Sequence, residues 1–78
     1  MDHLLQNRIT IIRRRQLESR IAVSRSTIYD WINPRSPRYK PDFPKPISIG
    51  GGAAVGWVAS EVDQWLADQI AASRRGVA

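Results

Sequence analysis

The sequence lacks cysteine and has one histidine, and this scarcity excludes several kinds of site. No disulfide can form, and no thiolate can bind a metal. Zinc would need carboxylate ligands, but the seven acidic residues are scattered singly along the chain. The one histidine, His3, lies near the N-terminus, which argues against a Ser-His-Asp arrangement. We therefore expect no enzyme, no metal, no cofactor and no small-molecule ligand.

Long apolar runs are also missing, so no segment is expected to cross a membrane. The first six residues do not show the basic-then-apolar order of a secretion signal. Residues 1–78 suit a single small domain, with a core of about residues 9–72 and flexible termini. A chain of this kind without cysteine is expected in the reducing cytoplasm.

Acidic residues are scarce in the first part of the chain. Residues 1–45 hold ten of the twelve Lys and Arg but four of the seven acids, whereas residues 46–78 are slightly acidic. A basic excess confined to one region attracts polyanions and speeds their association. Nucleic acid is the favoured partner, ahead of an anionic membrane surface or an acidic protein.

The first half of the chain predicts a short strand followed by two helices. "RITII" (8–12) is β-branched, and "RRRQLESRIAV" (13–23) places Leu17 and Ile21 on one helical stripe. Ser24 is a good N-cap for a second helix, which carries Ile28, Trp31 and Ile32 on one stripe and which Pro34 must end. Two short helices joined by a tight turn form a helix-turn-helix pattern.

Helix gives way to loop and strand in the middle of the chain. All five prolines lie in the basic segment 34–46, which excludes helix there. "PISIG" then alternates with period two, and after the glycines "VGW" follows, so we predict a β-hairpin with a glycine-rich tip. The glycines do not form a phosphate-binding loop, because no Lys-Ser/Thr pair follows them.

The last segment, "SEVDQWLADQIAASRRG" (60–76), predicts the clearest helix. Ser60 and Asp63 resemble a capping box. The apolar stripe, broken by one glutamine, is expected to close the core; it comprises Val62, Trp65, Leu66, Gln69 and Ile70. We expect the three tryptophans to be core residues, although aromatic side chains can also stack on the bases of single strands.

Three blocks in this order, "SRSTIYDWIN", "FPKPISIGGGAAVGW" and "SEVDQWLADQ", resemble the AlpA family of small prophage regulators. The resemblance covers roughly residues 9–72. It implies an α+β, mainly α, winged helix-turn-helix fold of the MerR or excisionase type, with a β-hairpin wing and a C-terminal helix. It also implies a double-stranded DNA partner, a promoter or attachment site, and a role as a transcriptional regulator, often of an integrase gene. Contact with an integrase, or self-association on DNA, is a further partner expectation.

The resemblance assigns the start of the recognition helix to the block from Ser24 to Tyr29, and the wing to the block from Pro46 to Trp57. The predicted wing residues are Ser48, Gly50, Gly51 and Gly52. A basic residue that often follows the two glycines of the family is replaced here by Gly52-Ala53-Ala54. The loop from Pro34 to Pro44 also exceeds that of the shortest members, and its added charges would compensate for this loss.

The outer face of the second helix is predicted to enter a major groove, which admits an α-helix. Its candidate residues are Arg25, Ser26, Thr27, Tyr29, Asp30 and Asn33. Arg25 would pair with guanine, Ser26 would meet a base or a phosphate, and Tyr29 would meet a phosphate. Thr27 lies toward the core and would help to cap the turn. Asp30 would orient Arg25 or accept from cytosine N4.

A second group of basic residues is predicted to contact phosphates, namely Arg13, Arg14, Arg15, Arg35, Arg38, Lys40 and Lys45. Arg13, Arg14 and Arg15 open the first helix, where the helix dipole disfavours cations, so we expect a partner outside the chain. A solvated charge cluster is the alternative. Two other functions remain open: an excisionase that sets recombination direction, and a protein-interaction module or anti-regulator that docks an acidic partner.

Overall fold

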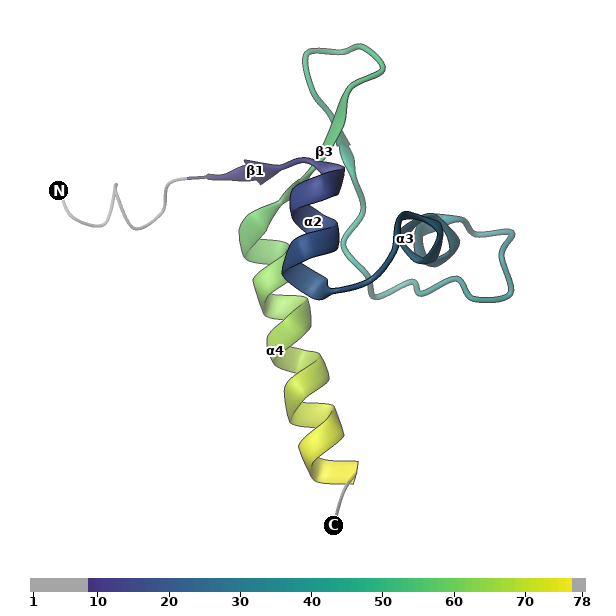
Figure 1. The fold of residues 1–78 in the computed structure, drawn as a ribbon, viewed down its shortest axis with the longest axis vertical. Helices are drawn as coiled ribbons and strands as arrows, with labels where there is room; N and C mark the ends of the chain where they lie inside the picture. The colour runs from purple at the N-terminus through teal and green to yellow at the C-terminus, as the bar shows by residue number, and fades with distance from the viewer. Residues whose placement is uncertain (1–8, 77–78) are drawn as a thin grey trace, which may run out of the picture.

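The computed structural model describes residues 9–76, arranged as three helices and a small sheet (Figure 1). The order is β1 (Ile11–Ile12), α2 (Arg14–Ile21), α3 (Arg25–Ile32), β2 (Ile47–Ser48), β3 (Val55–Val58) and α4 (Ala59–Gly76). This is the predicted α+β winged helix-turn-helix order. His3, Arg8 of the predicted first strand, and the two C-terminal residues lie outside the described residues.

The sheet has three antiparallel strands in the order β1-β3-β2. Ile12 pairs with Trp57 on one side of β3, and Ile47 pairs with Gly56 on the other. Gly56 is required at the centre, because a Cβ added there would lie 2.5 Å from Cγ2 of Ile11. The hairpin of β2 and β3 extends from the body as the wing (Figure 1).

Local sequence explains how the helix-turn-helix forms. Ala22 ends α2 in the left-handed conformation, and its N–H donates to the carbonyl of Glu18 at 2.8 Å. Ser24 then caps α3, since its Oγ accepts from the N–H of Thr27 at 3.3 Å. Asn33 is already extended ahead of Pro34, so α3 ends at Ile32, where the proline predicted it.

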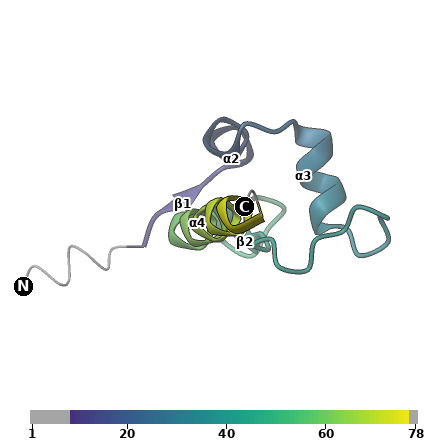
Figure 2. The ribbon, with the colours of Figure 1, turned by 90° about the horizontal axis from the view of Figure 1, so that it is seen from below.

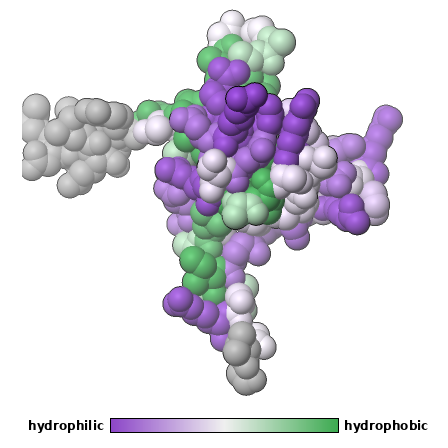
Figure 3. Space-filling model, in the orientation of Figure 1, coloured by the Kyte–Doolittle hydropathy of each residue, from purple (hydrophilic) through white to green (hydrophobic). Residues whose placement is uncertain are grey.

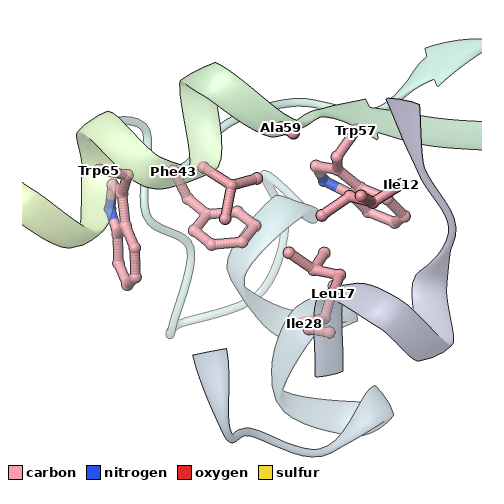
Figure 4. Close-up of a cluster of buried hydrophobic side chains, with 8 residues drawn as sticks. Ile12, Leu17, Ile28, Phe43, Trp57, Ala59 and Trp65 are labelled. Atoms are coloured by element: carbon pink, nitrogen blue, oxygen red, sulfur yellow. The ribbon is translucent and has the colours of Figure 1, made fainter. Parts of the chain in front are cut away.

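The core contains residues from every helix and from the proline-rich loop (Figure 4). It comprises Ile12, Leu17, Ile28, Phe43, Trp57, Ala59, Val62 and Trp65. Phe43 was not predicted as core, yet it contacts Trp65 edge-to-face with ring centroids 4.9 Å apart. Trp31 is half-buried beside both rings. The expectation that the three tryptophans serve the core, rather than base stacking, is consistent with this packing.

The second half of the proline-rich loop is anchored to this core by two hydrogen bonds. The N–H of Lys40 donates to the carbonyl of Trp31 at 2.9 Å. The indole Nε1 of Trp57 donates to the carbonyl of Pro44 at 3.2 Å. Burial of Phe43 between these two bonds fixes this half of the loop, so the proline-rich sequence here forms a packed connection.

Two predictions about α4 are wrong. The helix begins at Ala59, so Ser60 lies within its first turn and is not the N-cap. Val62 and Trp65 are buried as expected, but the side of the stripe beyond Leu66 is not, since Gln69 is exposed and Ile70 is 50% exposed. Figure 1 shows the reason: the helix runs past the other elements of residues 9–76, and none of these elements covers its last turns.

Candidate nucleic-acid interface

The N-terminal half of α3 has its polar side chains in solvent. Ile28 is fully buried and fixes the helix against the core, and Ser24 fixes its first turn. Arg25 and Ser26 are consequently exposed next to the free N–H groups of the helix start. Thr27 is half-buried, and its Oγ1 lies 3.1 Å from the Oγ of Ser24, in keeping with the predicted capping role.

Arg25 and Tyr29 form one unit on the outer surface of α3. The guanidinium carbon of Arg25 lies 5.5 Å from the ring centroid of Tyr29, one helical turn away. This cation–π contact limits the rotamers of Arg25. Tyr29 is 41% exposed, so its ring and hydroxyl remain accessible to a ligand. The two residues thus present a guanidinium group that lies over an aromatic ring.

The polar side chains at the C-terminal end of α3, in contrast, form bonds with the proline-rich loop. Asp30 accepts from Oγ of Ser36 at 3.3 Å and pairs with Arg38 at 3.5 Å. The expectation that Asp30 would orient Arg25 is therefore wrong. Oδ1 of Asn33 accepts from the N–H of Arg35 at 3.0 Å, closing an Asx-turn. In this half of the helix the side chains have intrachain partners.

A concave surface brings together three separate segments of the chain. It lies between the start of α2, the middle of α3 and the tip side of the wing, and we call it the basic groove. Its lining residues are Arg13, Arg14, Arg15, Tyr29, Ala53, Ala54 and Val55. Figure 3 shows hydrophilic side chains gathered over this face, below the wing. The folding of the chain thus adds the arginine triplet to the exposed half of α3.

The arginines of the triplet have different environments. Nε of Arg13 donates to the carbonyl of Val55 at 3.0 Å, which ties the start of α2 to the wing. Arg14 pairs with Glu18 one turn along α2. The guanidinium of Arg15 is exposed and has no ion-pair partner within residues 9–76. Arg13 and Arg14 therefore have partners within the chain, whereas a phosphate contact of the triplet stays a prediction.

The remaining basic candidates lie on the proline-rich loop. Nζ of Lys40 lies 5.4 Å from the ring centroid of Trp31, where the contact helps to cover a half-buried indole. Arg38 is paired with Asp30 but keeps 76% of its side chain exposed. Arg35 and Lys45 are exposed. None of these four lines the basic groove.

The wing has an ordered turn with a small, open tip. Oγ of Ser48 donates to the carbonyl of Gly52, and the N–H of Ile49 donates to the carbonyl of Ala54. Gly50 and Gly51 have φ of +70° and +76°, a region that favours glycine, so these two residues make the reversal possible. Ser48 is thus a structural residue of the turn.

Sequence reasoning missed three residues of the basic groove, Ala53, Ala54 and Val55. Small apolar side chains carry no binding signal, and the contribution of Val55 includes a backbone carbonyl. Only their position in the predicted wing could have indicated them. Among residues 9–76 no group of acids and histidines is arranged to hold a metal ion. Within the same range, no helix has both the length and the apolarity needed to span a membrane.

Comparison with known proteins shows which family the chain is part of. The profile described as "Prophage CP4-57 regulatory protein (AlpA)" matches residues 10–70. The chain belongs to the AlpA family. The match spans the helix-turn-helix, the wing and most of α4, so the elements that build the basic groove are all included.

Two relatives extend this comparison. The chain is 41% identical over 61 residues to the "DNA-binding transcriptional activator AlpA" of Escherichia coli K12, which covers 78% of this chain and 86% of that protein. It is 44% identical over 54 residues to "Uncharacterized protein ORF88" of Enterobacteria phage P4, covering 69% of this chain and 53% of that protein. No solved structure matches the chain.

Proposed function

We propose that this AlpA-family chain is a sequence-specific, double-stranded DNA-binding regulator of a prophage or integrative element. One observation carries the proposal: the basic groove joins the arginine triplet and the tip side of the wing to Tyr29 of α3. The E. coli relative is named a DNA-binding transcriptional activator, which supports the same activity here. Such a protein would act in the bacterial cytosol, where its DNA lies.

In this proposal the start of α3 enters the major groove. The major groove is about 12 Å wide and admits one helix, and the N-terminal residues of a recognition helix reach the base edges. Arg25 and Ser26 occupy those positions and are exposed. The guanidinium of Arg25 would donate two hydrogen bonds to guanine, one to O6 and one to N7. The ring of Tyr29 would support that orientation from below.

The phosphate contacts follow from the position of the basic groove. In a helix-turn-helix the first helix crosses the DNA backbone, which brings the start of α2 to the phosphates. Arg15, exposed and without an ion-pair partner among residues 9–76, would make the strongest of these contacts. Arg13 would keep the wing close to the same strand through its bond to Val55. The wing tip, which has no cation, would add backbone N–H groups only.

A binding experiment tests this function. The purified protein is titrated into labelled duplexes from the promoter and the attachment site of its own element, with a shuffled duplex as control. We expect binding to one of these duplexes at least tenfold tighter than to the shuffled duplex at moderate salt. Absence of a complex with any duplex at low salt would overturn DNA binding, and equal affinities would overturn sequence specificity.

A further inference from the structure

The C-terminal half of α3 carries a carboxylate on the surface that the proposed function turns toward DNA. Asp30 follows Ser26 by four residues, so the two side chains lie on the same side of the helix, one turn apart. A carboxylate at this position repels the phosphates of DNA. A DNA-binding helix therefore tolerates Asp30 only if the residue has a favourable role that offsets this repulsion.

Asp30 is the centre of a small network of bonds with the proline-rich loop. Its Oδ1 accepts from Oγ of Ser36 at 3.3 Å, and its Oδ2 pairs with Nη1 of Arg38 at 3.5 Å. Oγ of Ser36 also accepts from the backbone N–H of Arg38 at 3.1 Å. Arg38 is thus held through both its backbone and its side chain, and it occupies a defined place beside α3.

The turn that carries Arg38 is also fixed by its own backbone. The N–H of Ser36 donates to the carbonyl of Asn33 at 2.9 Å, and the N–H of Tyr39 donates to the carbonyl of Ser36 at 3.0 Å. Pro37 restricts the backbone φ angle within the same turn. A preformed element loses less conformational entropy when it binds a ligand. The turn therefore presents Arg38 in one arrangement before DNA arrives.

The guanidinium of Arg38 remains available to a ligand despite its bond to Asp30. A guanidinium has five N–H donors, and the contact with Oδ2 of Asp30 involves one nitrogen, Nη1. The side chain of Arg38 keeps 76% of its surface exposed. Asp30 thus orients the cation without enclosing it.

Tyr29 and Asp30 have basic elements on different sides of α3. Successive residues of a helix point about 100° apart, and Tyr29 lines the basic groove whereas Asp30 bonds to the loop. On this helical spacing Ser26 lies between the two. Figure 2 shows the loop turning back from the end of α3, while α2 adjoins its beginning. The exposed surface around Ser26 therefore has the basic groove on one side and Arg38 on the other.

We propose that Asp30 is a positioning residue, which holds Arg38 against the phosphate backbone on the side of the major groove opposite to the basic groove. The inference rests on the proposed binding of double-stranded DNA. The major groove is bordered by two phosphate backbones about 12 Å apart. The basic groove serves one backbone, and Arg38 serves the other. The contact that Arg38 gains with a phosphate exceeds the repulsion from Asp30, so this carboxylate promotes binding to a polyanion.

The sign of the effect of Asp30→Asn tests the inference on the full chain. Loss of a negative charge near DNA strengthens binding by itself, so a positioning role requires the opposite result. We expect about threefold weaker binding for Asp30→Asn and about fivefold for Arg38→Ala, which lies within the range of exposed ion pairs. Both losses should be similar on the specific and the shuffled duplex, because phosphate contacts carry no sequence information.

The double variant separates positioning from direct contact. Once Arg38→Ala has removed the guanidinium, Asp30 has only its repulsion to contribute. Asp30→Asn in that background should therefore leave affinity equal or raise it by up to about twofold at physiological salt. The change between the two backgrounds measures the coupling of the two residues. Arg38→Ala should also reduce the salt slope of log affinity by about 0.9.

Two further variants control for charge and for the loop. Ser36→Ala leaves every charge in place but removes the hydroxyl that joins Asp30 to Arg38, so it should also weaken binding to both duplexes. Asp63→Asn is the matched control, because Asp63 pairs with Arg20 at 3.4 Å and neither residue lines the basic groove. It should leave affinity nearly unchanged. Thermal melting sets a temperature at which all variants are folded, and affinities are compared there.

Three results would overturn the inference. An unchanged or higher affinity of Asp30→Asn, with the unmodified chain binding normally, would exclude the positioning role and leave the proposed function in place. A loss confined to the specific duplex, which persists in the Arg38→Ala background, would make Asp30 a base-reading residue that accepts from cytosine N4. Failure of the unmodified chain to bind any duplex would remove both the proposed function and this inference.

Discussion

Helices α3 and α4 meet in the same aromatic cluster but present opposite charge to solvent. Trp31 of α3 and Trp65 of α4 lie with ring centroids 5.5 Å apart. Beyond this shared contact, α3 begins beside the arginine triplet, whereas α4 carries the exposed carboxylates of Glu61 and Asp68. The two helices therefore share a packing contact, but their solvent-exposed surfaces differ in charge. Charge and neighbouring segments, rather than burial, determine what each helix can bind.

The largest expected effect comes from the packing that the two helices share. Trp65→Ala removes a buried indole and should lower the free energy of unfolding by about 3–5 kcal/mol. Ile70→Ala, on the exposed part of the same stripe, should change it by less than about 0.5 kcal/mol. Chemical denaturation followed by far-UV circular dichroism measures both variants. Similar losses would show that the end of α4 is packed in solution.

The second prediction concerns base reading by α3. Arg25→Ala should weaken binding to the specific duplex by about 1–3 kcal/mol, because a bidentate contact with guanine is lost. Its effect on a shuffled duplex should be smaller. Arg75→Ala, in the last turn of α4, is the matched control and should leave both affinities nearly unchanged. An equal loss on both duplexes would make Arg25 a phosphate contact.

The third prediction separates phosphate contacts from base contacts. The combined replacement of Arg13, Arg14 and Arg15 by Ala should flatten the dependence of log affinity on log salt by about 0.9 per lost contact. We expect one or two contacts, because successive helical residues point about 100° apart. Base preference should persist.

Arg15→Ala alone is the sharper variant, since Arg13 also bonds to Val55 and Arg14 to Glu18. Its stability should equal that of the unmodified chain while its salt slope falls by about 0.9. Replacement of Arg74 and Arg75 by Ala removes charge from α4 and serves as the control. A slope unchanged in the triple variant would return the triplet to the role of a solvated charge cluster.

The smallest expected effect tests whether the acidic side of α4 is independent of DNA binding. Glu61→Gln combined with Asp68→Asn should change affinity for the specific duplex by less than about twofold, because screening over roughly 8 Å weakens distant charges at physiological salt. Any change should be an increase, since negative charge is removed. A clear loss of DNA affinity in titrations would mean that the two surfaces are coupled.

The local sequence predicted the bounds of an element well where a single residue starts or stops it. Ser24 began α3 and Pro34 ended it, because a cap and a missing N–H act within one turn. The hairpin also formed at the glycines, where positive φ is needed. The start of α4 was misplaced by two residues, since Ser60 resembled a cap for a helix from Glu61, while the backbone of β3 led directly into the helix at Ala59.

The candidate site was less predictable, because its side chains choose among partners distant in sequence. Arg13 found the carbonyl of Val55, and Asp30 found Arg38 in place of Arg25. The sequence shows which residues are charged, but it does not show how far apart their side chains lie in the folded protein. The predicted base and phosphate contacts themselves remain predictions, for which the DNA titrations above are the test.

The sequence by itself determined where α3 begins and ends, the basic character of the first part, and the family, since each depends on residue type and spacing. Only the tertiary structure decided which polar groups stay available to a ligand. It brought the arginine triplet, Tyr29 and the tip side of the wing together in one groove, and it placed Phe43 against Trp65. The physical reason is that hydrogen bonds and ion pairs form wherever folding brings donor and acceptor within about 3 Å. Folding alone sets those distances.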